Sequence, residues 1–473
     1  MTSNSAASYL GTGQQPPSTF FVAAPRVSKW PPAAVTALMV ALVIPWVFSF
    51  GSVAVSLYRL VLLAVAVPTL AFWLSGKAGR IRAVDILLGL FCIWATIATI
   101  VVHGAMEAVE PSGILFLETF IAYLVARCYI RTYQDLVATT RILLLIVSVL
   151  LPLAIVEAIT QQKLTLELFR LVLPSIQGTT NELRWGLARV QGPFEHPILF
   201  GVFCGAPAAL AWLVLGVEAR LVQRWTMTAI VAGTSMLALS SGPMVALLVQ
   251  LALVVWSWTF QKTPFRWRIL WVVCIVTYCA LEVLSDQPVL HLLTRFAFDP
   301  WTAFYRLLIW EYGWASVMSH PLFGTGFNDW LRPAWMSSSI DMFWLLPAVR
   351  HGLPAGILLL SAFFTAYLAV SFKPCREQKL LACRTAYLIT LSGFFLAGWA
   401  VHFWNATYVL FTFLLGSGIW ILDAPGGAAA DPPVNARQGN SNRLRNSRVR
   451  PIRVSRQSYV QSAGNLSSHK DLG

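Results

Sequence analysis

Apolar runs with almost no interior charge recur along this chain from Ala33 to Leu422, and their length restricts the fold more than any other feature. Each run is roughly 17 to 22 residues long, which is what an α-helix needs to cross about 30 Å of hydrocarbon. Only 11% of the residues are charged and 57% are hydrophobic, whereas a soluble domain carries about 25% charged residues. The pattern predicts an all-α fold, a polytopic membrane helical bundle.

We predict about twelve transmembrane helices from these runs. The boundary at Ser241-Gly242-Pro243 stays open, because the helices on either side of it could instead form one broken helix. The predicted spans are Ala33–Phe50, Val53–Leu74, Val84–Val102, Gly113–Tyr129, Thr139–Ile159, Pro197–Gly216, Thr226–Ser240, Met244–Phe260, Arg268–Leu284, Leu353–Phe372, Thr385–His402 and Ala406–Leu422.

The net charge of +14 is distributed by topology and does not indicate a nucleic-acid partner. The short odd-numbered loops hold no Lys or Arg, while the even-numbered loops are basic, as Lys77, Arg80 and Arg82 show for the second loop. This alternation is the positive-inside pattern. It predicts a multi-pass membrane protein with both termini in the cytoplasm.

Three regions follow along the chain. Residues 1–30 are polar and are expected to be a disordered cytoplasmic N-terminus, residues 31–422 form the transmembrane domain, and residues 423–473 are expected to be a disordered basic tail. The tail is either a solvated topogenic segment or a patch that contacts anionic lipid headgroups. Within the domain, two long outer loops span residues 160–195 and 285–352, and loops of that size are commonly functional.

These outer loops contain arginines that the topology rule does not require. In the stretch RVQGPFEHP, Gly-Pro and His-Pro pairs mark the start of the sixth span, with Arg189 and His196 beside it. A helix N-terminus next to an arginine is a ready anion site, above all for phosphate. The alternative is that Arg189 reaches lipid headgroups, as many interfacial arginines do.

Several motifs in order are similar to those of the O-antigen ligase/polymerase superfamily. They are RVQGPFEHPILFG (Arg189–Gly201), LALSSGPMVALL (Leu237–Leu248), YRLLIW (Tyr305–Trp310), HPLFGTG (His320–Gly326) and DMFWLLPAVRHGLPAG (Asp341–Gly356), while FLETFIAYLVAR (Phe116–Arg127) resembles the fourth span of the exopolysaccharide-polymerase branch.

The resemblance implies a bundle of the membrane-glycosyltransferase type in the bacterial inner membrane. Such a protein transfers a glycan from undecaprenyl diphosphate to an acceptor hydroxyl at the extracytoplasmic face, without any cofactor or metal. The partners it implies are the undecaprenyl-diphosphate-linked glycan, an acceptor glycan or lipid, membrane lipids and other polysaccharide-assembly proteins. The substrate diphosphate is expected to bind Arg189 and Arg306 first, with support from Arg184, Arg350 and His196. Arg306 could instead pair with Glu311.

For the general base the sequence departs from the ligase pattern, because this chain has Asp341-Met342 where family ligases carry His-Asn. Asp341 and His320 are the catalytic candidates, and Glu195, His196 and His351 are further alternatives. The departure from His-Asn favours a polymerase over an O-antigen ligase that acts on a lipid core.

Three ionisable residues fall inside predicted spans, namely Arg59, Glu118 and Glu282, and each is expected to face the bundle interior. A secondary transporter remains an alternative because about twelve spans is a common transporter size. Transporters tend to show paired repeats with broken helices at matching positions, and the long outer loops here have no inner counterpart.

Overall fold

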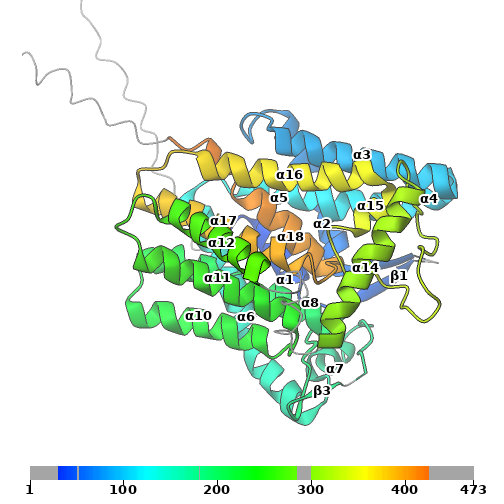
Figure 1. Ribbon diagram of the computed structural model, residues 1–473, viewed down its shortest axis with the longest axis horizontal. Helices are drawn as coiled ribbons and strands as arrows, with labels where there is room; N and C mark the ends of the chain where they lie inside the picture. Colours follow the sequence, from blue (N-terminus) through cyan, green and yellow to red (C-terminus); the bar gives the residue numbers. More distant parts are fainter. Residues whose placement is uncertain (1–29, 51–52, 181, 285–299, 426–473) are drawn as a thin grey trace, which may run out of the picture. The chain divides into compact units, whose positions relative to one another are not determined.

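The computed structural model describes residues 30–50, 53–180, 182–284 and 300–425, so most of the predicted N-terminal segment and nearly all of the predicted basic tail lie outside the described residues. Within these ranges the chain is a bundle of α-helices with two short antiparallel hairpins (Figure 1). The predicted all-α, polytopic fold is confirmed.

Nine helical segments of the described chain are long and apolar enough to cross a membrane. They are α2 (Leu57–Leu74), α3 (Ala83–His103), α4 with η1 and α5 (Ala105–Phe116, Leu117–Ile121 and Ala122–Tyr129), α6 (Tyr133–Thr160), α8 with α9 and η2 (Pro197–Gly205, Ala208–Leu213 and Leu215–Val217), α11 (Ser241–Thr259), α16 (Leu353–Phe372), α17 (Gln378–Ala397), and α18 with η3 (Asn405–Ser417 and Ile419–Leu422).

The first predicted span, Ala33–Phe50, is wrong as a single helix. Helix α1 covers only Ala33–Ala41, and the chain then forms a hairpin in which β1 (Val47–Phe50) pairs with β2 (Val53–Ser56). Pro45 lies between the helix and the hairpin and has no N–H to donate to a helix, while the Val and Phe residues that follow favour extended backbone.

The region around Ser241 contains two helices. Helix α10 (Leu221–Met236) ends before the predicted boundary, and α11 begins at Ser241 itself. Residues 237–240 join the two helices, and Leu239 adopts a left-handed backbone conformation there, with φ of 45°. This linker leaves backbone carbonyls free to accept hydrogen bonds from other loops.

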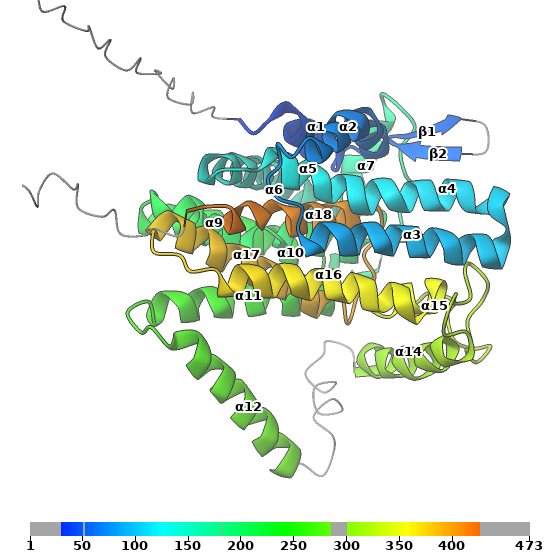
Figure 2. The same cartoon turned by 90° about the horizontal axis from the view of Figure 1, so that it is seen from above.

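Helix α12 (Arg266–Leu284) corresponds to the ninth predicted span, and Figure 2 shows it diverging from the neighbouring helices. Every side chain from Trp271 to Val283 is exposed, including Glu282. The expectation that Glu282 faces the bundle interior is therefore wrong, because α12 does not pack its faces into the core.

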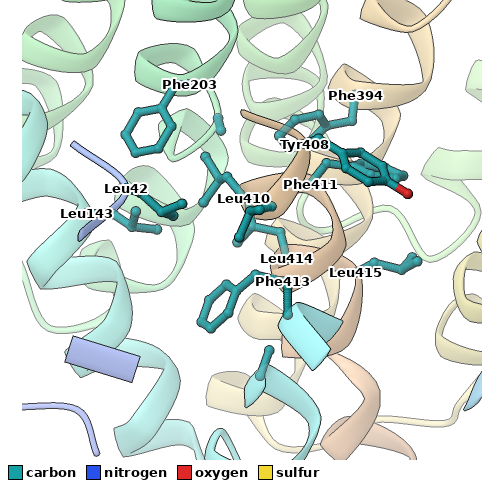
Figure 3. Packing of buried hydrophobic residues seen from close by; sticks show 14 of the residues in the cluster. Leu42, Leu143, Phe203, Phe394, Tyr408, Leu410, Phe411, Phe413, Leu414 and Leu415 are labelled. Atoms are coloured by element: carbon teal, nitrogen blue, oxygen red, sulfur yellow. The ribbon is translucent and has the colours of Figure 1, made fainter. Parts of the chain in front are cut away.

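Helix α18 forms the centre of the bundle and is buried along nearly its whole length. Figure 3 shows its Leu410, Phe411 and Phe413 side chains in a core that also contains Phe203 of α8 and Leu143 of α6. Helix α18 packs against α5, and α16 packs against α3. Because α18 is enclosed by other helices, the residues at its N-terminus are held in a defined position.

The helix connections fall into two groups at opposite ends of the bundle. The α1–α2 hairpin meets the loop after α6, where Val47 N–H donates to the Pro174 carbonyl at 3.0 Å. The opposite end gathers basic side chains, and there Asp423 forms ion pairs with Arg82 and Arg127. The two long loops, which the sequence analysis assigns to one side of the membrane, both belong to the first end.

The long loops have secondary structure of their own. The first contains helix α7 (Leu164–Arg170) and a hairpin of β3 (Leu183–Arg184) and β4 (Leu187–Ala188). The second contains α14 (Pro300–Ser319) and α15 (Leu346–His351).

Candidate active site

A cavity of about 250 Å³ lies between α3, α4, α15, α16 and the start of α18. Its walls are mostly apolar, with Phe91, Ile114, Leu115, Leu346 and Leu359 among them. A small set of polar side chains also lines it. These are Arg350, His351, His402, Asn405 and Glu118, with Thr99 and Ser112.

Arg350 is positioned by backbone hydrogen bonds from the HPLFGTG motif. Thr325 N–H donates to the Val349 carbonyl at 2.8 Å, and Gly326 N–H donates to the Arg350 carbonyl at 2.9 Å. Leu353 N–H in turn donates to the Pro321 carbonyl at 2.8 Å. The motif therefore forms a turn that clamps the short helix α15 at its C-terminal end.

The Arg350 guanidinium has no acidic partner among the described residues. Its central carbon lies 5.5 Å from the centroid of the Phe327 ring, in a cation–π contact. Burial lowers its pKa, yet an arginine keeps its charge at physiological pH. The cavity thus contains a positive charge that no acidic side chain of the described residues neutralises, and such a charge favours an anionic ligand.

A buried hydrogen-bonded network borders the same cavity. Glu118 lies in the π-helical turn η1, and its Oε1 accepts from Arg59 Nε at 2.8 Å and from the Tyr58 hydroxyl at 3.0 Å. Arg59 Nη2 donates to Asn405 Oδ1 at 3.0 Å, and Asn405 Nδ2 donates to Glu195 Oε1 at 2.7 Å. The expectation that Arg59 and Glu118 face the bundle interior is confirmed, and π-helical turns occur frequently at functional sites.

This network also fixes the start of α18. Asn405 has a φ of 52°, a left-handed conformation that is uncommon for residues other than glycine. The other Glu195 oxygen, Oε2, is buried and accepts no hydrogen bond from the described residues. Burial raises the pKa of Glu195, because a carboxylate loses its hydration when it leaves water.

Arg189 and Arg184 lie at the β3–β4 hairpin and bind the linker between α10 and α11. Arg189 is buried; its Nη1 is 2.5 Å from Glu182 Oε2, and its Nε is 3.5 Å from the Ala238 carbonyl oxygen. Arg184 Nη1 donates to the Leu239 carbonyl at 2.8 Å. Both arginines therefore attach the first long loop to the bundle, and neither lines the cavity.

Arg306 attaches the second long loop to the connection between α17 and α18. Its Nε donates to the Ala400 carbonyl at 2.9 Å. Nearby, Phe343 N–H donates to the Val401 carbonyl at 3.1 Å. Two segments of the second loop thus hold residues 398–404 in place, and this connection carries His402 into the cavity wall.

His196 caps helix α8, which begins at Pro197 as the sequence predicts. Its Nδ1 accepts a hydrogen bond from Ile198 N–H at 3.2 Å. Burial lowers the pKa of His196, and the charge of Arg189 lowers it further. The side chain itself therefore occupies part of the helix start at which an anion was expected. Its ring centroid lies 6.2 Å from that of Trp404, which lines the cavity.

The two catalytic candidates lie outside the cavity wall. Asp341 is half-buried and accepts a hydrogen bond from the Ser339 hydroxyl at 2.7 Å. His320 is exposed just after α14, with its Nδ1 2.9 Å from the Ser319 hydroxyl oxygen. Of the seven predicted site residues, the structure places Arg350 in the cavity wall and the other six at its periphery or in the loops.

Sequence reasoning missed His402 and Asn405 as site residues. The stretch HFWN directly before the last predicted span was the available signal, since it places two polar side chains at a helix start. Glu118 was noted only as a costly charge within a span. These residues meet Arg350 because helices that are distant in sequence pack together.

Acidification is expected to destabilise the fold through His351 and His402. Burial, with a smaller contribution from Arg350, lowers the pKa of His351 to about 4 and that of His402 to about 3. Both pKa values return to about 6.5 in the unfolded chain. Below about pH 6.5 the unfolded state therefore binds more protons than the folded state. The contribution of the two histidines to the free energy of unfolding is fully present above that pH and decreases as the pH falls.

At about pH 5 the free energy of unfolding is lower by roughly 2 kcal/mol for each histidine. It can be measured as the melting temperature in detergent between about pH 7.5 and about pH 5. The double variant His351→Gln, His402→Gln should show a weaker pH dependence than the parent. Equal slopes for the parent and the double variant would contradict this assignment.

The fold defines a multi-pass helical membrane protein, and its described part contains a largely apolar cavity that Arg350 lines. Residues 226–360 match the family model Wzy_C, described as O-antigen ligase. The comparison with curated proteins found no match. This match supports the resemblance to the O-antigen ligase/polymerase superfamily over that part of the chain. The matched segment contains Arg306 and Arg350, while Arg189 and His402 lie outside it.

Proposed function

We propose that this protein transfers a glycan from undecaprenyl diphosphate to the hydroxyl of an acceptor glycan, as a polysaccharide polymerase at the extracytoplasmic face of the inner membrane. The match of residues 226–360 to the O-antigen ligase model supports a lipid-linked glycan as substrate. The observation that carries the proposal is the Arg350 guanidinium, which lines an otherwise largely apolar cavity without an acidic partner among the described residues.

The chemistry of a lipid-linked diphosphate suits this cavity. Apolar walls favour the polyprenyl part of the donor, and a fixed guanidinium favours its diphosphate. When the bond between the sugar and the diphosphate breaks, negative charge grows on the leaving oxygen. A preorganised cation in a partly dry site stabilises that charge more than water does.

The other predicted arginines support the same reaction from the loops. Arg189 and Arg184 hold the first loop on the α10–α11 linker, and Arg306 holds the second loop on the α17–α18 connection. Both linkers lie at the end of the bundle with the long loops. We propose that these arginines keep the loops in the positions that a donor diphosphate requires, and that Arg350 contacts the diphosphate.

The proposal is tested by incubating the purified protein with a lipid-diphosphate oligosaccharide in detergent or in vesicles without an ion gradient. A polymerase should produce longer lipid-linked chains from this donor alone. Transfer only after lipid A-core is added would identify a ligase instead. Uptake that depends on an ion gradient, with no glycan transfer, would support the transporter alternative.

A further inference from the structure

The imidazole of His402 lines the cavity, and the proposed function gives it no role. It lies on the connection between α17 and α18, near Arg350 and three residues before Asn405. Its Nδ1 is buried and forms no hydrogen bond with any described residue. Its ring lies near two aromatic rings, with its centroid 6.5 Å from that of Phe343 and 5.4 Å from that of Trp404.

The connection that carries His402 is held on both sides of the histidine. Before it, the Ala400 carbonyl accepts from Arg306, and the Val401 carbonyl accepts from Phe343 N–H. After it, the Asn405 side chain is held by Arg59 and Glu195. An imidazole on such a rigid segment can be aimed at a reacting atom without further ordering.

The charges around His402 favour the neutral form of its imidazole. Helix α15 contributes Arg350 and His351, and η1 contributes Glu118, whose charge is offset by Arg59. Burial and the Arg350 charge both disfavour the imidazolium, and the pKa of His402 is lowered to about 3. A neutral imidazole has a ring nitrogen that accepts a proton or a hydrogen bond.

A diphosphate bound to Arg350 would reverse this balance. Its negative charge would offset the guanidinium and favour a positive charge on the nearby imidazole. His402 would then become a stronger base in the donor complex, where a base is needed. Anion binding at Arg350 and proton binding at His402 are therefore expected to favour each other.

We propose that His402 is the general base of the transfer reaction. This assignment rests on the proposed function, the transfer of a glycan. In this step the acceptor hydroxyl oxygen forms a bond to the anomeric carbon of the donor sugar. The bond from that carbon to the diphosphate oxygen breaks, and its electron pair leaves with the diphosphate toward Arg350. The hydroxyl proton passes to a ring nitrogen of His402, and the departing diphosphate stabilises the imidazolium.

The test compares His402→Gln with His320→Gln, since His320 is the other candidate histidine and lies outside the cavity wall. His402→Gln should lower the transfer rate at saturating donor and acceptor by roughly 10²- to 10⁴-fold, the usual contribution of general acid–base catalysis. Its affinity for the lipid-diphosphate donor should stay near that of the parent. His320→Gln should keep the parent rate.

Two further measurements separate a base from a structural residue. Added imidazole should restore part of the activity of His402→Ala but not that of His402→Gln, because only the first variant leaves space for it. The parent rate should fall at acidic pH as the base becomes protonated, and the residual rate of His402→Gln should lack this fall.

The failures of the two proposals differ. If the parent protein transfers no glycan from the lipid-diphosphate donor, the proposed function fails. If the parent is active and His402→Gln retains the parent rate, the proposed function stands and the assignment of His402 fails. Loss of activity in His320→Gln alone would move the role of base to His320.

Discussion

Replacing Arg350 by alanine is expected to lower the rate of glycan transfer by roughly 10²- to 10³-fold, the effect of removing one preorganised group that stabilises charge in a transition state. Arg350 is the guanidinium that lines the cavity, and no carboxylate among the described residues shares its charge. Its removal leaves the cavity without that fixed cation. The measurement is the rate of chain growth from a lipid-diphosphate oligosaccharide by the purified variant.

Two variants make this result specific. Arg350→Lys keeps the charge but loses the planar group that can form two parallel hydrogen bonds with a phosphate, so partial activity is expected. Arg170→Ala is the matched control, because Arg170 is an exposed arginine of the first long loop that donates to the Ile176 carbonyl. Full activity in Arg350→Ala would show that the diphosphate binds elsewhere.

Arg189→Ala and Arg306→Ala should also lose activity, but by a different route. Each side chain holds a loop on a backbone carbonyl, and Arg189→Ala would leave Glu182 without its ion-pair partner. Their loss of activity should therefore come with a lower melting temperature. Arg350→Ala should lose activity with little change in melting temperature. This difference distinguishes a residue that contacts the donor from residues that hold the loops in place.

Gly352→Ala is expected to have the largest effect on stability of any single methyl group added near the site. Gly352 has a φ of 82°, and a Cβ at this position would lie only 1.9 Å from the Leu322 carbonyl oxygen. A left-handed backbone strained by a side chain costs about 1–3 kcal/mol, and the overlap with backbone adds to that cost. The turn that clamps α15 would have to move, taking Arg350 and His351 with it.

The measurement is the melting temperature together with the transfer rate of Gly352→Ala, and both should fall. Gly233→Ala serves as the control, because Gly233 lies in α10 and a Cβ there would meet nothing within 4 Å. That substitution should be neutral or should stabilise the helix by up to about 1 kcal/mol. Parent-like behaviour of Gly352→Ala would contradict the described packing of α15.

The predictions that rested on local patterns agree with the structure. Each apolar run contains a helix, although the first run is helical only over Ala33–Ala41, and nine helical segments of the described residues are long and apolar enough to span a membrane. The His196-Pro197 pair starts α8. The HPLFGTG motif forms a turn, with Gly324 and Gly326 both at positive φ. These features depend on the length of each apolar run and on the positions of proline and glycine. Proline and glycine restrict or free the backbone within a few residues, so their effects can be seen in the sequence.

The assignment of roles to the arginines could not be made in the same way. Motif position favoured Arg189 and Arg306, yet the structure uses both to fasten loops. Motif position gave Arg350 only a supporting role. Helix α15 has six residues, which is too short for periodicity to show which side faces inward. The direction of a side chain on so short a helix is decided by the turns that hold it.

By itself, the sequence determined that this chain is a multi-pass helical protein, where most of its helices begin and end, and which loops are long enough to carry function. These properties follow from the free energy of placing apolar and polar groups in lipid and from local backbone restrictions. Only the tertiary structure decided which polar groups share a cavity. Glu118, Arg350 and His402 are far apart in the chain and meet because α18 is enclosed by the other helices, and such packing depends on shape complementarity between distant segments.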